Sequence, residues 1–348
     1  MPKLDNSNVS DNAKTDEVWE AVEADFVGLQ SEMSESKNLI REDPTTDNKE
    51  VTPSLFRRTK QTLMERPKQI FGPAWAQGEN AIFFGEDGSC KTIGAVQIAC
   101  AIATGTSIPG FPNEIPAQAV AIFDAELSDY QFNNRYPAGL PDQVYRFTFD
   151  EGQQKILIGA TAEFVVDQIE AAANSVQAKI IILDNLSALA SMLDLTKTSD
   201  SIQLMGLLND LKKKGFSTLI IDHTRKPMKE GDFKTISKHD LQGSKMKSNL
   251  VDSVFSIGKS CQGENIRYIK CLKIRSYEMA YTRNAVATMR LITDPLRLEF
   301  LGTNAEWEHI NDRNSEMMKM SSQGRTQAEI AREFGISQQA VSKTLKSW

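Results

Sequence analysis

The stretch FFGEDGSCKT, residues 83–92, has the features of a phosphate-binding loop and determines how the rest of the chain is interpreted. Two phenylalanines end an apolar run, glycines follow, and Lys91-Thr92 open a segment of helical character. Backbone N–H groups of such a loop bind phosphate, the lysine reaches the terminal phosphates, and the threonine can ligate Mg²⁺. The sequence therefore predicts a site for ATP and Mg²⁺, formed by Gly85, Glu86, Asp87, Gly88, Ser89, Cys90, Lys91 and Thr92.

One position departs from the usual pattern, which has glycine just before the lysine, whereas this chain has Cys90. The cysteine keeps the N–H that binds phosphate. Its Cβ costs about 1–2 kcal/mol only if the backbone there needs a positive φ. The alternative is a glycine-rich turn that precedes a lysine by coincidence, and the loop alone does not decide between the two.

Strands and helices alternate from about residue 68 to residue 223. Apolar runs predict five strands, and helical stretches are expected at Lys91 to Ala103, 160–173 and 200–214; the strands are AIFF, AQAVAIFDAE, VYRFTF, KIIILDN and STLIIDH. This alternation predicts an α/β fold with a mainly parallel sheet covered by helices on both faces. After residue 250 the pattern predicts antiparallel additions to the sheet edge, namely SVFSIG, IRYIKCLKI, ATMRLITD and LRLEFLG.

Composition divides the chain into parts. Residues 1–50 contain 13 Asp and Glu against 5 Lys and Arg, whereas the whole chain carries −6, so the remainder carries about +2 and is compatible with a polyanionic partner. Val18 to Leu29 have helical spacing, which indicates either a docking helix or a transient helix in a solvated segment. We expect a disordered acidic tail (1–55), an ATPase domain (56–302), a linker (303–320) and a helix-turn-helix (321–348).

The cysteines, histidines and apolar stretches limit the class of protein. The four cysteines form no CxxC pair, and three histidines are too few for an obvious metal cluster. No stretch approaches the ~20 apolar residues that span a bilayer, and no signal peptide opens the chain. We therefore expect a cytoplasmic protein with free thiols, no structural metal and no membrane partner.

Polar residues follow three of the predicted strands. Asp184 lies near the end of KIIILDN, where an acid can hold Mg²⁺; Glu126 follows VAIFD, where a carboxylate can orient the attacking water; and His223 ends STLIIDH. Ligands of open parallel sheets bind at the carboxyl ends of the strands, so these groups should meet the phosphate-binding loop at one edge.

The loop, DAEL, ILDN and IDHTRK, in this order, resemble the RecA/DnaB superfamily of P-loop ATPases, in particular the RepA-like hexameric helicases of plasmids and mobile elements. The resemblance covers about residues 68–300 and extends to LQGSK (241–245). It implies a RecA-like sheet, with Glu126 as the catalytic glutamate, Asp184 as the Walker B acid, and His223 as a sensor that links the γ-phosphate to DNA.

A basic pair, Lys273 and Arg275 in CLKIRS, shares one face of a predicted strand because side chains alternate with period two. By the resemblance, this pair would reach the γ-phosphate of a neighbouring subunit as an arginine finger, in a ring or filament that is expected to be a hexamer. The alternative is an exposed basic face on an edge strand.

A long lysine-rich segment follows the fifth strand, TRKPMKEGDFKTISKHDLQGSKMKS. Loops of this length are usually functional or disordered. By the resemblance it would line a channel and bind single-stranded DNA; the alternative is a solvated loop. The expected DNA-binding residues are Arg225, Lys226, Lys229 and Lys234.

The C-terminal stretch GRTQAEIAREFGISQQAVSKTLKSW has a helix-turn-helix pattern. Thr326 and Ser337 are expected to cap two helices, and Gly335 makes the turn between them. The second helix would read duplex DNA; the alternative is a helical hairpin for protein contacts. The expected contacts are Gln338, Gln339, Ser342 and Lys343.

These features predict an ATP-dependent DNA-binding motor or helicase-like ATPase of a plasmid or mobile element, acting in DNA replication or maintenance. A DNA-binding regulatory protein that uses ATP binding only to control its assembly is the alternative. Cys90 favours the alternative, whereas Glu126, Lys273 and Arg275 favour the enzyme.

Overall fold

The computed structural model describes residues 65–148, 161–192, 198–225, 232–242 and 245–347. The expected acidic tail, together with Lys226 and Lys229, lies outside them. None of the described helices is long and apolar enough to cross a membrane.

A nine-stranded mixed sheet forms the core, with strand order β11-β10-β9-β8-β3-β7-β6-β4-β5. The six strands from β8 to β5 in this order are parallel, and the other three are antiparallel. The mainly parallel α/β sheet predicted from the alternation is confirmed. The strands are β3 (Asn80–Gly85), β4 (Val120–Asp124), β5 (Val144–Thr148), β6 (Ile180–Asp184), β7 (Ser217–His223), β8 (Ser253–Lys259), β9 (Ile266–Lys273), β10 (Val286–Thr293) and β11 (Leu296–Asn304).

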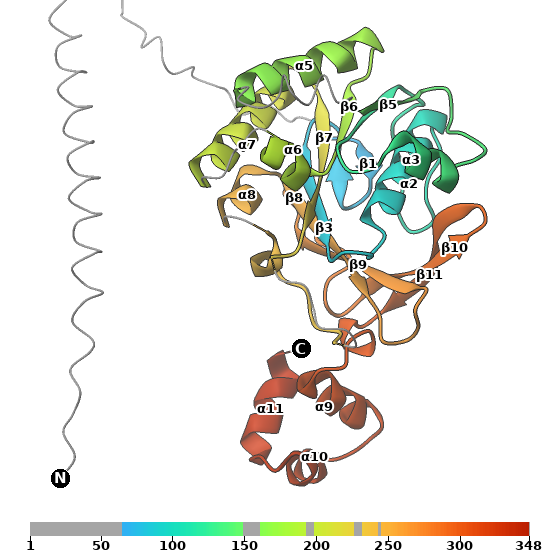
Figure 1. The fold of residues 1–348 in the computed structure, drawn as a ribbon. Helices are drawn as coiled ribbons and strands as arrows, with labels where there is room; N and C mark the ends of the chain where they lie inside the picture. Colours follow the sequence, from blue (N-terminus) through green and yellow to red (C-terminus); the bar gives the residue numbers. More distant parts are fainter. Residues whose placement is uncertain (1–64, 149–160, 193–197, 226–231, 243–244, 348) are drawn as a thin grey trace, which may run out of the picture. The chain divides into compact units, whose positions relative to one another are not determined.

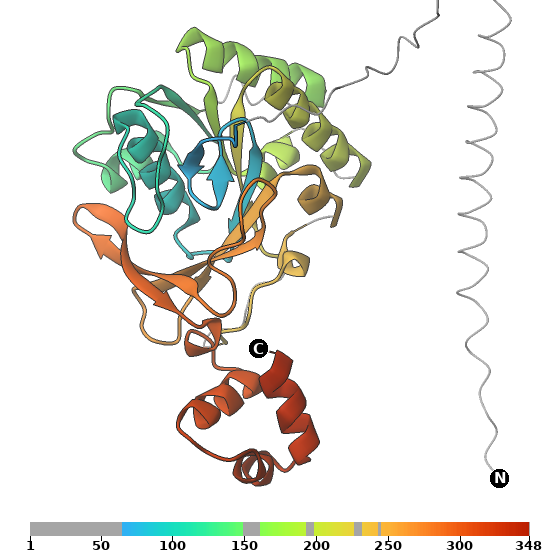
Figure 2. The same cartoon turned by 180° about the vertical axis from the view of Figure 1, so that it is seen from behind.

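The prediction for SVFSIG was wrong, because β8 runs parallel to β3 and lies next to it. Val254 faces one hydrophobic core, while Phe255 and Ile257 face the other. A strand buried on both faces is typical of the interior of a parallel sheet, and its sequence alone does not reveal its direction. A small antiparallel hairpin was not predicted; it is formed by β1 (Gln69–Phe71) and β2 (Trp75–Ala76) and is visible in Figure 2.

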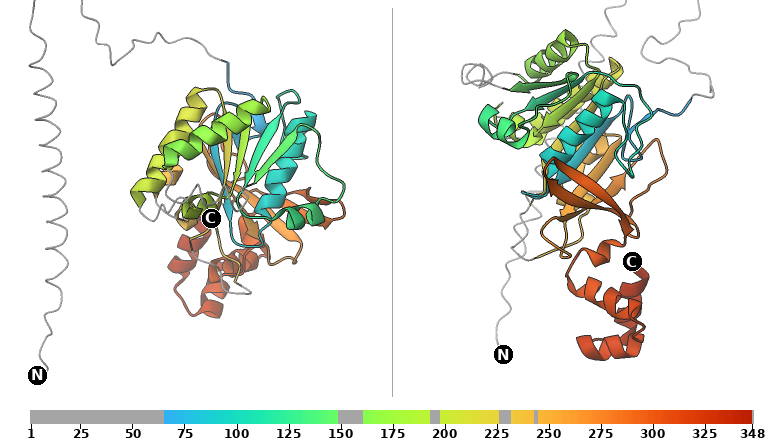
Figure 3. Two further views of the ribbon diagram at one scale, coloured as in Figure 1. Left: turned by 45° about the horizontal axis from the view of Figure 1, so that its top comes forward. Right: turned by 90° about the vertical axis from the view of Figure 1, so that its right-hand side faces the viewer.

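Helices cover both faces of the sheet, as the alternation predicts (Figures 1 and 3). On one face α2 (Lys91–Thr104) buries Val96 and Ile98 against the strands, and α3 (Asp129–Arg135) adds Phe132. On the other face lie α5 (Ala162–Ser175), α6 (Leu186–Met192) and α7 (Thr198–Lys213), which contribute residues such as Ile169 and Leu208.

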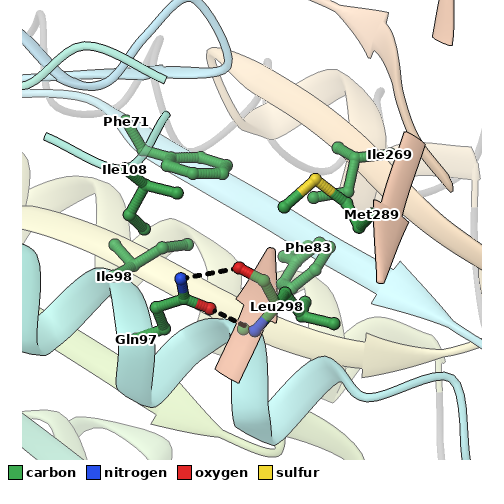
Figure 4. A pocket seen from close by; sticks show the side chains of 9 residues that line it. Phe71, Phe83, Gln97, Ile98, Ile108, Ile269, Met289 and Leu298 are labelled. Carbon is green, nitrogen blue, oxygen red and sulfur yellow. Dashed lines mark hydrogen bonds between the residues drawn. The ribbon is translucent and has the colours of Figure 1, made fainter. Parts of the chain in front are cut away.

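The helix after the phosphate-binding loop is fastened to the antiparallel part of the sheet. The Gln97 amide of α2 donates to the Leu298 carbonyl at 2.9 Å and accepts from the Leu298 N–H at 2.8 Å, so it pairs with β11 as a strand would (Figure 4). Because Leu296 at the start of β11 borders the pocket described below, this contact fixes one wall of the site.

After β11 the chain continues through η2 (Glu306–Glu308) into α9 (Arg313–Ser322), α10 (Gln327–Phe334) and α11 (Gln338–Ser347). The expected linker, residues 303–320, thus contains the end of a strand and most of α9. The Asp312 side chain accepts from the Ser315 N–H and starts α9. Met317 of α9 packs with Ile330 and Val341, so the three helices share one small core.

Candidate nucleotide site

The polar strand ends predicted to meet do so at one edge. β3, β7, β6 and β4 are consecutive in the sheet, Gly85 pairs with His223, and Asp124 pairs with Asp184. At this edge lies a pocket of about 410 Å³. It is lined by Asp87, Gly88, Cys90, Lys91, Thr92, Ile93, Glu126, Arg135, His223 and Leu296.

The backbone of the phosphate-binding loop has conformations that disfavour residues with a Cβ. A Cβ at Gly85 would lie 2.4 Å from the Ile257 carbonyl oxygen of β8, so only glycine fits there. Gly88 has φ 70°, and Cys90, which precedes α2, has φ 76° and ψ 27°. Cys90 therefore has the positive φ at which its Cβ is strained, and this strain costs about 1–2 kcal/mol of stability. The residue keeps its N–H in the loop despite this strain.

Lys91 is held inside the loop. Its ammonium donates to the Gly85 carbonyl at 3.0 Å and to the Glu86 carbonyl at 2.9 Å. Burial lowers the pKa of Lys91, and the nearby carboxylate of Asp87 acts in the opposite direction. Lys91 can therefore exchange its two carbonyl acceptors for phosphate oxygens. Three residues of the loop do not line the pocket, namely Gly85, Glu86 and Ser89.

Asp184 has the properties of a cation ligand. The residue is 3% exposed, and among the described residues its Oδ1 has no hydrogen-bond partner. Burial raises the pKa of Asp184 to about 7, and a hydrogen bond with Thr92 acts in the opposite direction. A buried oxygen without a partner fits a Mg²⁺ ligand, with Thr92 beside it. The described residues contain no cluster of three or more His, Cys, Asp or Glu ligands, so phosphate oxygens and water would complete the coordination.

Glu126 is presented by a braced turn after β4. Oδ1 of Asp124 accepts from the N–H groups of Glu126 at 3.0 Å and Leu127 at 2.9 Å. Oδ2 of Asp124 pairs with Arg146 of β5 at 2.9 Å, and Arg146 also donates to the Leu127 carbonyl at 2.7 Å. This network fixes the backbone that places the Glu126 carboxylate at the pocket.

His223 joins the loop to the other strand ends. Its Nδ1 lies 2.7 Å from an Asp87 carboxylate oxygen, and its Nε2 lies 2.9 Å from the amide nitrogen of Asn185. The same amide nitrogen donates to Glu126 at 2.7 Å. Asn185 was not predicted as a site residue, although its place directly after Asp184 in ILDN is a signal for it.

Other groups near the loop were also missed. Arg135, at the end of α3, lines the pocket. Arg267 of β9 donates to the Gly88 carbonyl at 3.3 Å. Burial raises the pKa of Glu86 in the loop, and the cations of Lys259 and Arg267 partly offset this. No sequence signal marks Arg135, Lys259 and Arg267, because strands and a helix distant in the chain bring them to the loop.

The basic pair, Lys273 and Arg275, is held by its own chain. The Lys273 ammonium donates to the carbonyls of Ser248 (2.7 Å) and Val251 (2.6 Å), at the end of α8 (Lys245–Leu250). Arg275 follows the strand, donates to the Asn249 carbonyl and lies 3.5 Å from Asp252. Neither residue lines the pocket of its own chain, and the Arg275 side chain is 55% exposed.

The lysine-rich segment is described only in part. Lys234 is exposed and pairs with Asp232 at 2.9 Å, and the Arg225 N–H donates to the Asp240 carbonyl. Lys247, by contrast, forms a buried ion pair with Asp222 at 2.9 Å, with side chains 7% and 0% exposed. Lys247, in the same segment but not among the four expected DNA-binding residues, therefore offers no free charge for DNA, since Asp222 neutralises it inside the protein.

The last two helices begin at the predicted caps. Thr326 Oγ1 accepts from the Glu329 N–H, and Ser337 Oγ accepts from the Ala340 N–H. Gly335 ends α10 with φ 62°. Of the four expected DNA contacts, Gln338, Gln339 and Lys343 are exposed and Ser342 is half-buried. One face of α11 carries Gln339, Ser342 and Lys343 together with Lys346.

The fold and the pocket together define a P-loop ATPase-like domain. A family model described as an AAA domain matches residues 45–229, slightly more than half of the chain, and the protein belongs to that family. No curated protein matches the chain.

Proposed function

We propose that the protein is an ATP-hydrolysing motor that assembles on DNA, with a helicase-like role in replicating or maintaining a plasmid or other mobile element. One observation carries this proposal. Lys91 and Thr92 of the loop line one pocket on the carboxyl edge of the sheet together with Glu126 and His223 from two strand ends, and Asp184 from a third strand end hydrogen-bonds to Thr92. An attacking water, a triphosphate and a cation each find a suitable group there.

The residues divide the chemistry between them. Loop N–H groups and Lys91 bind the β- and γ-phosphates, and Thr92 and Asp184 would hold Mg²⁺, which neutralises charge on the phosphate oxygens when bound. Glu126 orients a water for attack on the γ-phosphorus, whose bond to the bridging oxygen of ADP then breaks. His223, beside Lys91, senses the terminal phosphate.

ATP sites completed between subunits are part of the proposal. Arg275 is the better of the two finger candidates, because its side chain is 55% exposed and its contacts within the chain are long, at 3.3 and 3.5 Å, whereas Lys273 donates to carbonyls at 2.6 and 2.7 Å. Arg275→Ala should stop turnover and spare ATP binding. Mixing it with Glu126→Gln should restore part of the activity in mixed oligomers, because some interfaces then pair an intact finger with an intact glutamate. No recovery in verified mixed oligomers contradicts completion in trans.

In this proposal, α11 binds duplex DNA, whereas the lysine-rich segment binds single-stranded DNA. α11 would enter the major groove of a duplex, with Gln338 and Gln339 at base edges and Lys343 at phosphates. The segment from Arg225 to Lys234 would hold a single strand. α10 and α11 would then form the helix-turn-helix, with α9 completing its core through Met317.

Duplex binding is tested on intact protein. Alanine at Gln338, Gln339 and Lys343 together should abolish sequence-preferring duplex binding, measured by fluorescence anisotropy at fixed salt, and leave basal turnover unchanged. Arg332→Ala, at an exposed position of α10, is the matched control. Unchanged duplex affinity in the triple variant would support the alternative of a helical hairpin for protein contacts.

The decisive measurement for the motor is ATP turnover with and without single-stranded DNA, together with mass in solution. We expect an oligomer whose turnover rises with single-stranded DNA and disappears in Glu126→Gln. A monomer with full turnover excludes the ring or filament, and a wild-type chain that binds no nucleotide at millimolar ATP excludes the enzyme.

The second candidate is a DNA-binding regulator that uses ATP binding only to control assembly. The strained Cys90 favours it, because a Cβ at positive φ disfavours the loop conformation that would bind phosphate. ATP binding that changes the mass in solution, with no phosphate released in a single-turnover experiment, would establish this function in place of the motor.

A further inference from the structure

Asn185 occupies the centre of the polar groups at the strand ends. It follows β6, is 5% exposed, and lies between the carboxylate of Glu126 and the ring of His223. Its Nδ2 is 2.7 Å from Glu126 Oε2 and 2.9 Å from His223 Nε2. One amide group therefore contacts the carboxylate that follows β4 and the imidazole at the end of β7, the two strands that flank β6.

The orientation of the Asn185 amide follows from its third contact. Its Oδ1 accepts from the Ala188 N–H at 2.7 Å. Because a backbone N–H can only donate, oxygen must occupy this position and the NH₂ group must face Glu126 and His223. The two N–H bonds of that group are enough for one donation to each.

This orientation determines which nitrogen of His223 carries the proton. Nε2 accepts from Asn185, so in the neutral ring the proton is on Nδ1. Nδ1 then donates to the Asp87 carboxylate at 2.7 Å. Lys91 approaches the same nitrogen at 3.5 Å, but an ammonium has only donors, so that approach is not a hydrogen bond in this tautomer.

The same orientation holds Glu126. Its Oε2 accepts from Asn185, and among the described residues no protein donor is found for Oε1, which can therefore accept from a water. Glu126 is exposed, and an exposed carboxylate without this contact would rotate among several positions. A fixed carboxylate keeps the water in one place relative to the γ-phosphorus.

We propose that Asn185 is a positioning residue that ties Glu126 to His223 and selects the His223 tautomer with the proton on Nδ1. The role in turnover rests on the proposed ATPase function. The tautomer does not, since it is a property of the nucleotide-free protein.

The tautomer is tested by ¹⁵N NMR of histidine-labelled full-length protein. Only three histidines are present, His223, His239 and His309, and a His223→Gln spectrum assigns the signal. We expect an unprotonated Nε2 and a protonated Nδ1 in nucleotide-free protein at pH 8. In Asn185→Asp an acceptor replaces the donor, so the proton should move to Nε2. A wild-type spectrum with protonated Nε2 overturns the proposal, whatever the protein does with ATP.

Kinetics test the positioning of Glu126. Asn185→Leu keeps the approximate size and removes both donors, and we expect kcat to fall by about 10- to 100-fold while KM changes by less than about threefold. Asn185→Ser, smaller and polar, provides a second variant if the first fails to fold, with the same expected direction. Asn314→Leu, an exposed substitution on α9, is the matched control and should leave both constants unchanged.

The outcomes separate the two proposals. A folded Asn185→Leu or Asn185→Ser protein with wild-type kcat overturns the positioning role. An equal fall in ATP affinity and kcat/KM, with kcat unchanged, assigns Asn185 to nucleotide binding and also overturns it. A wild-type protein without turnover, but with the expected tautomer, refutes the ATPase function and the kinetic role while the tautomer assignment stands.

Discussion

Asp124 and Asp184 are opposite each other on neighbouring parallel strands, and each residue is 3% exposed. Their surroundings differ. Asp124 accepts two backbone N–H groups and pairs with Arg146, whereas Oδ1 of Asp184 has no partner among the described residues. Burial raises the pKa of Asp184 to about 7.

The comparison shows how a buried carboxylate that stabilises the fold can be distinguished from one that binds a ligand at this sheet edge. A buried carboxylate that is fully hydrogen-bonded stabilises the fold, and removing it leaves other groups without partners. A buried carboxylate with an unused oxygen lowers stability in the empty protein and gains its partner only with a ligand. Residue type and position are the same in both cases, and only the neighbours differ.

The largest effect is expected for Asp184→Asn, because the amide keeps the shape and loses the charge. ATP turnover should fall by about 1,000-fold, while the nucleotide-free protein at pH 8 gains on the order of 2 kcal/mol. The pKa of Asp184 is raised, so its destabilising effect grows as the pH rises from about 4 to 7. Urea unfolding at pH 5 and pH 8 measures the gain, and a less stable variant at pH 8 would contradict the interpretation.

Asp124→Ala should destabilise the protein by about 3 kcal/mol, because two N–H groups and the Arg146 guanidinium lose their acceptor. Asp129→Ala is the matched control. It removes another carboxylate bound to Arg146, but one whose side chain is 76% exposed, so the loss should stay below about 1 kcal/mol. Equal losses by urea unfolding would remove the contrast between the two aspartates.

His309 extends the comparison to a buried group that is hydrogen-bonded in its neutral form, between Ser260 and Thr288. Burial lowers the pKa of His309 to about 4. The unfolded chain therefore binds the proton first as the pH falls below about 6.5, and about 2 kcal/mol of stability should be lost by pH 4.5. His309→Gln should flatten this part of the profile. His239→Gln, in the exposed η1 (Lys238–Asp240), should not.

The smallest effect is expected for Cys90→Gly, which removes the Cβ at φ 76°. The gain in stability should be about 1 kcal/mol or less, because glycine also increases the entropy of the unfolded chain. ATP affinity, measured by titration calorimetry, should be unchanged or higher. Cys90→Ala keeps the Cβ and should resemble the wild type. Weaker ATP binding in Cys90→Gly alone would show that the thiol has a role of its own.

Much of the fold followed from local pattern. Continuous apolar runs, separated by helical stretches, predicted β3 to β7 and the helices α2, α5 and α7, because a strand buried on both faces is apolar at nearly every position. The direction of β8 could not be predicted, since a strand with both faces buried has the same composition in either direction. α9 was missed because its apolar residues find their partners only in α10 and α11.

The candidate site divides in the same way. The sequence by itself determined the phosphate-binding loop, Lys91, Thr92 and the three polar strand ends, because parallel strands bring their carboxyl ends to one edge whatever the loops do. Only the tertiary structure decided that Cys90 has a positive φ, that Lys247 is neutralised by Asp222, and that Asn185 joins Glu126 to His223. The sequence of one strand specifies at which edge of the sheet a side chain lies, whereas the residues that contact this side chain come from strands and helices far away in the chain.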